Sequence, residues 1–191
     1  MRARAHTASM EIILGEFRCG VNHSCDAPRQ KGALPMHTDS QLHLARYVPA
    51  LITFLANKLA AGASQCYRKH FGIGVVEWRM LSMLAVENGI TANRICQVIG
   101  LDKGAVSRSL QTLEAAGHVR SQVDPQDARR NTVSLTASGR ELHDRVLKVA
   151  LERERRLLSG LSAEEVDTLI ELLGRLHNQV NNVNEYDPNN D

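Results

Sequence analysis

Apolar residues recur at helical spacing through most of the chain beyond residue 40. Residues 40 to 70 carry an apolar stripe three to four residues apart, which predicts a long amphipathic helix. Its members are Leu44, Val48, Leu51, Ile52, Leu55, Ala56 and Leu59. Pro49 lies inside this stretch and should either kink the helix or mark its true beginning, because proline removes a backbone hydrogen bond. A second helix is expected over residues 75 to 87, where Asn88-Gly89 ends it.

Two short helices joined by a tight turn are predicted next. Thr91 can cap the first, which places Ile95 inward, and Gly100-Leu101-Asp102 forms the turn. Asp102 then caps a second helix that ends at Gly117. The apolar positions of that second helix are Val106, Leu110 and Leu113. Two helices with a turn of about three residues between them form a helix-turn-helix pattern.

Alternating residues follow this pattern directly. Residues 119 to 124 and 132 to 136 are predicted as two strands, with a basic loop over residues 125 to 131 between them. A helix-turn-helix followed by a two-stranded ribbon is the winged-helix arrangement. Two further helices are predicted over residues 137 to 158 and 163 to 183, and Ser162 with Glu165 forms a capping box before the last one. The expected fold is mainly α, with about six helices and a small antiparallel β-wing.

These elements divide the chain into five segments. Residues 1 to 36 show no sustained period and are expected to be a disordered extension, or to precede a true start at Met36. Residues 37 to 74 form an N-terminal helical segment, residues 75 to 136 the winged helix, and residues 137 to 184 the C-terminal helices. The polar residues 185 to 191 are expected to fray.

Composition excludes several classes of protein. A content of 43% hydrophobic and 23% charged residues is typical of a globular chain, and a net charge of only +2 excludes a uniformly basic coat protein. The chain has neither an apolar stretch of about 20 residues nor a secretory signal, so we expect a cytoplasmic location. Its four cysteines lack metal-binding spacing, and familiar catalytic motifs are missing. The sequence therefore predicts neither a metal, nor a cofactor, nor an enzyme.

The second helix of a helix-turn-helix enters the major groove of DNA, so its outward residues are candidates for base and phosphate contacts. Arg108 could bind guanine with two hydrogen bonds, and Gln111 could read adenine. Lys103 and Ser107 could bond to phosphate or to a base edge. Thr91, Asn93 and Arg94 begin the preceding helix, where free backbone amides favour phosphate. The alternative for the outward residues of the second helix is an ordinary solvated helix face.

The loop between the predicted strands carries a second group of candidates. Arg129 and Arg130 would stand at the tip of a ribbon that can reach an adjacent minor groove. Asp127 could orient the Arg129 guanidinium by accepting two hydrogen bonds. The alternative is a hairpin turn with solvated charges.

Two strings of this sequence resemble the MarR family of bacterial winged-helix transcriptional regulators. They are Leu101-Asp-Lys-Gly-Ala-Val-Ser-Arg108-Ser-Leu-Gln-Thr-Leu113-Glu-Ala-Ala-Gly117 and Asp124-Pro-Gln-Asp127-Ala-Arg129-Arg-Asn-Thr-Val133-Ser-Leu135-Thr136-Ala-Ser-Gly139. The resemblance extends over about residues 38 to 184. It implies an obligate homodimer, held by the first helix and the last two, that reads a palindrome in double-stranded DNA. It also implies repression relieved by a small, often aromatic or phenolic, ligand.

The apolar stripes support a homodimer independently, because three long amphipathic helices exceed what a small winged helix can cover. A ligand pocket is expected where the first two helices meet the dimerisation helices and the winged helix. The polar and aromatic residues available there are Tyr47, Tyr67, His70, Trp78 and Arg79. The simpler interpretation, that Trp78 and the tyrosines belong to the core, is favoured for each one.

Two alternative functions remain open on the sequence. The weak net charge would also suit a winged-helix module that binds other proteins and not DNA. A thiol-based redox sensor using Cys66 is the other, although a buried structural thiol is the favoured interpretation of that residue.

Overall fold

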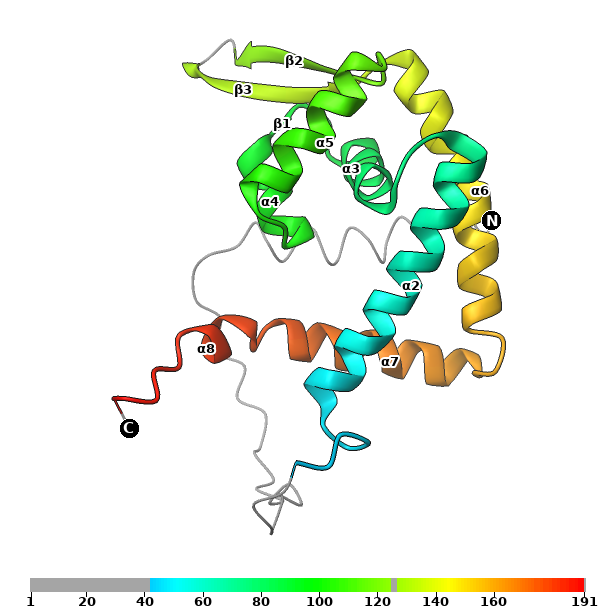
Figure 1. Cartoon of the computed structure of the whole chain (residues 1–191), viewed down its shortest axis with the longest axis vertical. Helices are drawn as coiled ribbons and strands as arrows, with labels where there is room; N and C mark the ends of the chain where they lie inside the picture. Colours follow the sequence, from blue (N-terminus) through cyan, green and yellow to red (C-terminus); the bar gives the residue numbers. More distant parts are fainter. Residues whose placement is uncertain (1–41, 125–126, 191) are drawn as a thin grey trace. The chain divides into compact units, whose positions relative to one another are not determined.

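The computed structural model describes residues 42–124 and 127–190, with the side chains of residues 124–129 left out (Figure 1). The chain divides into two compact units, one containing residues 42–150 of the described chain and the other residues 151–190. The helices of the first unit are α2 (Val48–Phe71), α3 (Val75–Val86), α4 (Ala92–Ile99), α5 (Lys103–Ala115) and the first part of α6 (Ala137–Leu157). Its strands are β1 (Ile90–Thr91), β2 (Val119–Asp124) and β3 (Asp127–Leu135).

The long helix α2 begins at Val48, so Pro49 marks the beginning of the helix and does not kink it. Proline is tolerated in the first turn because the backbone amide it lacks has no intrahelical partner there. The helix ends at Gly72, whose φ of 75° is the left-handed conformation that glycine adopts without strain. Residues 42 to 47 precede α2 without helical structure, which shortens the stretch predicted from residue 40.

The helix-turn-helix is formed by the caps that the sequence predicts. The Thr91 hydroxyl accepts the Arg94 N–H at 3.2 Å and begins α4, which ends at Gly100 with φ of 71°. The Asp102 carboxylate accepts the Ala105 N–H at 2.9 Å and begins α5. Each bond satisfies one of the amides that a helix leaves unpaired at its N-terminus.

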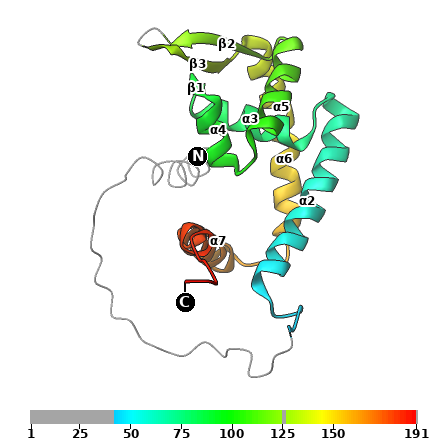
Figure 2. The same ribbon diagram turned by 60° about the vertical axis from the view of Figure 1, so that its left-hand side comes forward.

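The sheet contains three antiparallel strands in the order β1-β3-β2. Strand β1, which the sequence analysis missed, pairs Ile90 with Val133 and Thr91 with Thr132. Strand β3 begins at Asp127 and not at Thr132, so the loop predicted over residues 125 to 131 was wrong from residue 127 onward. The β2–β3 hairpin projects beyond α3, α4 and α5 of the same unit (Figures 1 and 2). Residues 127 to 131 of β3 are held by backbone pairing with β2. Because this pairing does not require apolar side chains, the segment lacks the apolar alternation by which strands are recognised in a sequence.

The core of the first unit lies between α3, the helix-turn-helix and the beginning of α6. Its largest fully buried side chains are Met80, Leu81, Leu84, Ile95, Val106, Leu113 and Val146. Burying one such side chain contributes roughly 1.5–3 kcal/mol, so these positions carry much of the stability of the unit. They hold α5 from the inside and leave its opposite face to solvent.

The second unit consists of the end of α6, α7 (Ala163–His177) and α8 (Val180–Asn184). The predicted capping box is confirmed, because Ser162 Oγ accepts the Glu165 N–H at 3.3 Å and Glu165 accepts the Ser162 N–H at 2.8 Å. The single helix predicted to Val183 was wrong, since α7 ends at His177 and α8 is separate. Asparagine and glutamine crowd residues 178 to 184, and asparagine competes for backbone hydrogen bonds, which weakens a continuous helix. In the described part of the chain, none of the helices is long and apolar enough to cross a membrane.

Candidate nucleic-acid interface

Helix α5 presents a polar face to solvent on the side opposite the core. Val106 and Leu113 are buried, whereas the groove-facing candidates predicted on this helix are all exposed. These are Lys103, Ser107, Arg108 and Gln111. Gly104 lies between them, and a Cβ there would lie 3.3 Å from the Arg108 guanidinium, so glycine leaves that side chain room over the first turn. The structure thus brings two cations, a hydroxyl and an amide to one helix face.

A polar hollow of about 560 Å³ lies beside the N-terminus of α4. It brings together Thr91, Asn93 and Arg94, the candidates predicted at the beginning of α4, with Arg130, a candidate predicted on the wing. The remaining lining residues are Ala92, Gln97 and Asn131. Gln97 and Asn131 were missed because they become neighbours only when β3 folds beside α4. Helical spacing from Asn93 to Gln97 was the one signal that could have found Gln97.

Arg94 is held by an ion pair within the first unit. Its Nη2 lies 3.2 Å from Glu87 Oε2, and its side chain is only 19% exposed. The pair joins the beginning of α4 to the C-terminal end of α3. The ion pair therefore fixes the orientation of the Arg94 side chain in the free protein. Because part of the guanidinium is bonded to Glu87, fewer of its N–H donors remain for a phosphate.

Arg130 lies within strand β3 and is exposed. It was predicted at the tip of the wing, but it lines the hollow beside α4 instead. The side chains of Asp127 and Arg129 lie outside the described residues, and so does the contact predicted between them. Arg120 on β2 is also exposed and adds a cation that was not selected from the sequence. The Ser121 N–H donates to Glu114 Oε1 at 2.8 Å, which fastens the wing to the end of α5.

The residues predicted for a ligand pocket do not all converge. Tyr67 and Trp78 touch edge to face at 5.9 Å between ring centroids, and Trp78 stacks on His143 of α6 at 5.4 Å. His70 and Arg79 are close to Tyr67 and Trp78 in the sequence, and both are exposed. Tyr47 precedes α2 and lies about 30 Å along the helix axis from Tyr67, at 1.5 Å per residue, so one chain cannot bring it to the cluster.

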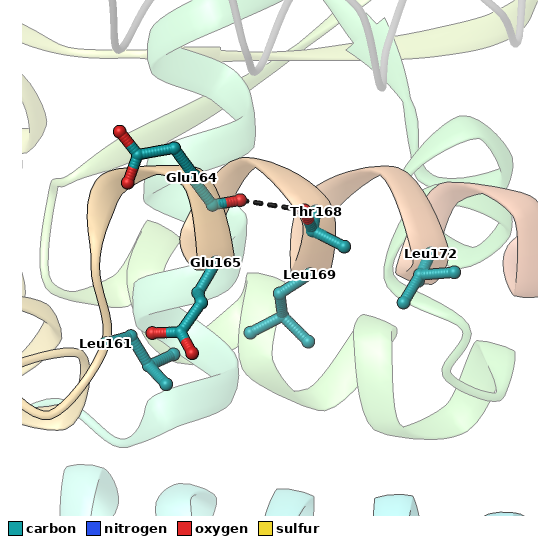
Figure 3. A pocket seen from close by; sticks show the side chains of 6 residues that line it. All are labelled: Leu161, Glu164, Glu165, Thr168, Leu169 and Leu172. Carbon is teal, nitrogen blue, oxygen red and sulfur yellow. Dashed lines mark hydrogen bonds between the residues drawn. The ribbon is translucent and has the colours of Figure 1, made fainter.

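A second hollow, of about 370 Å³, lies on α7 (Figure 3). Leu161, Leu169 and Leu172 line it together with Glu164, Glu165 and Thr168. Leu161, Glu165 and Leu169 point to the same side of the helix, whereas Glu164 points to the other (Figure 3). With carboxylates and leucines but no cation, this open surface is unsuited to a phosphate.

The two described cysteines are half-buried and free. Cys66 on α2 and Cys96 on α4 both pack against the core cluster, and Cys19 and Cys25 lie outside the described residues. The packing of Cys66 agrees with the structural interpretation favoured from the sequence. The described residues contain no cluster of histidine, cysteine or carboxylate side chains that could hold a metal ion.

Comparison with known proteins identifies the same architecture. The sequence profile of the MarR family matches residues 71–130. YdgJ of Bacillus subtilis (strain 168), described as an uncharacterised HTH-type transcriptional regulator, is 34% identical over 115 residues, which is 59% of this chain and 68% of YdgJ.

Two solved structures are also similar. A MarR/EmrR family transcriptional regulator from Acinetobacter sp. ADP1 is 36% identical with a TM-score of 0.70, over 74% of this chain and 99% of that one. The S. aureus MepR–DNA complex is 26% identical with a TM-score of 0.61, over 69% of this chain and 95% of that one. The mainly helical winged-helix fold and the sequence identity to these regulators point to the same family. This chain belongs to the MarR family and is a DNA-binding transcriptional regulator, not an enzyme.

Proposed function

We propose that the protein is a homodimeric, sequence-specific repressor that binds a pseudo-palindromic operator and is released by a small aromatic ligand. The observation that carries the DNA-reading part is the exposed face of α5, with Arg108 and Gln111 one turn apart on a helix held rigidly from behind. Arginine and glutamine match the major-groove edges of guanine and adenine. The family assignment favours this function over a winged helix that binds only proteins.

The remaining contacts would position the protein on the duplex. Asn93, Gln97 and Arg130 surround the hollow beside the N-terminus of α4, where a phosphate would meet the Arg130 cation and the positive end of a helix. Arg129 of the wing would enter the adjacent minor groove. Contacts of this kind fix the register of α5 on the bases.

The dimer is supported by uncovered apolar surface on α7 and on the first half of α2. None of the residues of α7 is buried, and Leu169, Ile170 and Leu173 are each 38–47% exposed. Val48, Leu51 and Leu55 on α2 are 45–53% exposed. Surfaces of this kind usually mark an interface, and a second copy of the chain can supply matching stripes. We therefore assign residues 37–74 and 137–184 to dimerisation, of which residues 37–41 lie outside the described residues. Two winged helices related by a two-fold axis would read half-sites about 10 bp apart.

The ligand site is proposed at the aromatic cluster of Tyr67 and Trp78. Trp78 belongs to α3 and contacts residues of α2 and α6, so a ligand packed against it could shift these helices relative to the winged helix. Trp78 is the only tryptophan of the chain. Its fluorescence therefore reports on this position alone, and a screen of aromatic acids and phenols should find a compound that quenches it and releases DNA.

A fluorescence-anisotropy titration tests the DNA-reading proposal. The protein is titrated against DNA from upstream of its own gene, with scrambled DNA as competitor and at two salt concentrations. We expect selective binding with a slope of about −0.9 per phosphate neutralised in a plot of log affinity against log salt. Arg108→Ala should lower operator affinity by roughly 5- to 150-fold, the value of a bidentate base contact.

Two further variants complete this experiment. Arg129→Ala should also weaken operator binding, and Lys148→Ala, an exposed cation on α6, serves as the matched control. Unchanged operator affinity in both arginine variants would contradict the proposal.

A further inference from the structure

The carboxylate of Glu77 joins two helices of the winged-helix unit. One oxygen, Oε2, accepts the Gly74 N–H at 2.9 Å and so caps α3. The other, Oε1, accepts a hydrogen bond from Ser109 Oγ of α5 at 2.6 Å. Residues 77 and 109 are far apart in sequence, and both side chains are half-buried. The capping interaction belongs to α3 alone, whereas the bond to Ser109 is made to the helix that faces DNA.

We infer that Glu77 is a positioning residue for operator recognition, because its hydrogen bond to Ser109 sets the rotation of α5 about its own axis. The inference rests on the proposed role of α5 in reading bases. Ser109 directly follows Arg108 and lies two residues from both Ser107 and Gln111. Since successive residues of a helix are about 100° apart, fixing Ser109 on the α3 side fixes the direction of all three groove-facing side chains.

The surrounding contacts explain why this bond is needed in addition to apolar packing. Val106 and Leu113 hold α5 against the core, but apolar contacts are not directional and allow a helix to rotate slightly. A short hydrogen bond to a carboxylate is directional and is roughly twice as strong as one between neutral groups. The bidentate contact expected of Arg108 tolerates little angular error, so a small rotation of α5 would weaken it.

The same carboxylate lies next to the junction between α2 and α3. A Cβ placed on Gly74 would lie 2.7 Å from Glu77 Oε2 and 3.3 Å from Arg68 Nε of the last turn of α2. Gly74 thus leaves the space in which the α3 carboxylate and the α2 guanidinium approach each other. The anchor of α5 is therefore placed where the long helix α2 meets the winged helix.

Operator selectivity is the readout that separates a positioning role from a merely structural one. Full-length Ser109→Ala and Glu77→Gln are titrated with operator and with scrambled DNA, beside the wild type. Ser82→Ala is the matched control, because its half-buried hydroxyl bonds only to the Trp78 carbonyl within α3. We expect Ser109→Ala to lower operator affinity about tenfold, the worth of a hydrogen bond to a charged group, and to change scrambled-DNA affinity less than about twofold.

Two companion variants make the outcome decisive. Ser109→Thr keeps the hydroxyl and should retain most of the selectivity, and the Glu77→Gln/Ser109→Ala double variant should lose no more than Ser109→Ala alone, because both act through one bond. An equal loss on operator and scrambled DNA, or no loss at all, overturns the inference. If Arg108→Ala abolishes selectivity while Ser109→Ala retains it, the proposed function stands and only this inference fails. A wild type without selectivity overturns both.

Discussion

Helices α5 and α7 begin with the same local signals and end in different surroundings. Both follow a side chain that caps the first turn, Asp102 for α5 and Ser162 for α7, and both carry an apolar stripe. Helix α5 buries Val106 and Leu113 within its own unit, whereas α7 buries none of its residues. A cap and a stripe therefore predict a helix and its inward side, but they do not say which chain covers that side.

The difference matters for stability because helices of this length are marginal in water without packing. Helix α5 has its packing in the same chain, so its stability should be independent of protein concentration. Helix α7, if covered by a second copy, gains its packing only on association, and its stability should rise with protein concentration.

Leu84→Ala removes a fully buried side chain from α3 in the core behind α5. It should lower the free energy of unfolding of the winged-helix unit by about 2–5 kcal/mol, because truncation loses transfer free energy and leaves a cavity. Chemical denaturation measured at two protein concentrations checks this, and the loss should be the same at both. A loss that depends on concentration would mean that this core also relies on association.

Leu173→Glu places a charge on the exposed stripe of α7. It should raise the dimer dissociation constant by roughly 10- to 100-fold, since a leucine at an interface contributes about 1.5–3 kcal/mol by burial. Analytical ultracentrifugation measures the change. The control Glu171→Gln alters a strongly exposed residue of the same helix. If Leu173→Glu leaves the mass distribution of the wild type unaltered, α7 is not part of the interface.

The two caps provide a matched pair of smaller changes. Asp102→Ala should cost about 1 kcal/mol in unfolding of the winged-helix unit, because the Ala105 N–H loses its partner. Ser162→Ala should cost less, since its bond to the Glu165 N–H is longer at 3.3 Å. Thermal unfolding at low and high protein concentration distinguishes them, with the effect of Ser162→Ala confined to the concentration-dependent transition. Equal effects in one transition would show that the two units unfold together.

The smallest effect is expected at Glu152, near the end of α6. Side-chain hydrogen bonds from Arg155 and then Arg156 lower the pKa of this carboxyl from 4.5 to about 2. A carboxyl with a lowered pKa in the folded state stabilises above its unfolded pKa and loses that contribution as the pH falls toward the folded one. The stability difference between wild type and Glu152→Gln should thus be present above pH 4.5 and disappear toward pH 2, and it should be small because the Glu152 side chain is 42% exposed and solvent screens its ion pairs. NMR titration of the Glu152 carboxyl measures the pKa directly, and an ordinary value would contradict the ion pairs.

Much of the fold could be predicted because its signals are local. Thr91, Asp102 and Ser162 cap the helices predicted for them, and Gly100 ends α4 in the left-handed conformation. Strand β1 could not be predicted, because its pairing with β3 joins residues about forty apart. The first residues of β3 were missed because they pair with β2 through the backbone and carry no apolar alternation. The break between α7 and α8 was missed because Val180 and Val183 continue the apolar spacing across it.

The candidate site divides in the same way. Exposure of Lys103, Ser107, Arg108 and Gln111 follows from the helical period and the buried positions between them, so one helix suffices to predict it. The hollow that joins Gln97 and Asn131 depends on β3 lying beside α4, and the Glu77–Ser109 bond depends on α3 crossing α5. Neither contact could be predicted, because contacts between distant residues produce no periodic pattern in the sequence.

Local residue patterns are enough to predict where α4, α5 and α7 begin, which face of α5 is polar, and which family the residues resemble. These properties depend on interactions within a few residues, whose free energies are set by side-chain type and spacing. Three features depend on the folded chain: Arg94 is held by Glu87, Arg130 lies beside the N-terminus of α4, and the stripe of α7 is uncovered in one chain. Contacts between distant residues form only when the whole core is packed, because only then does burial offset the entropy of bringing those segments together.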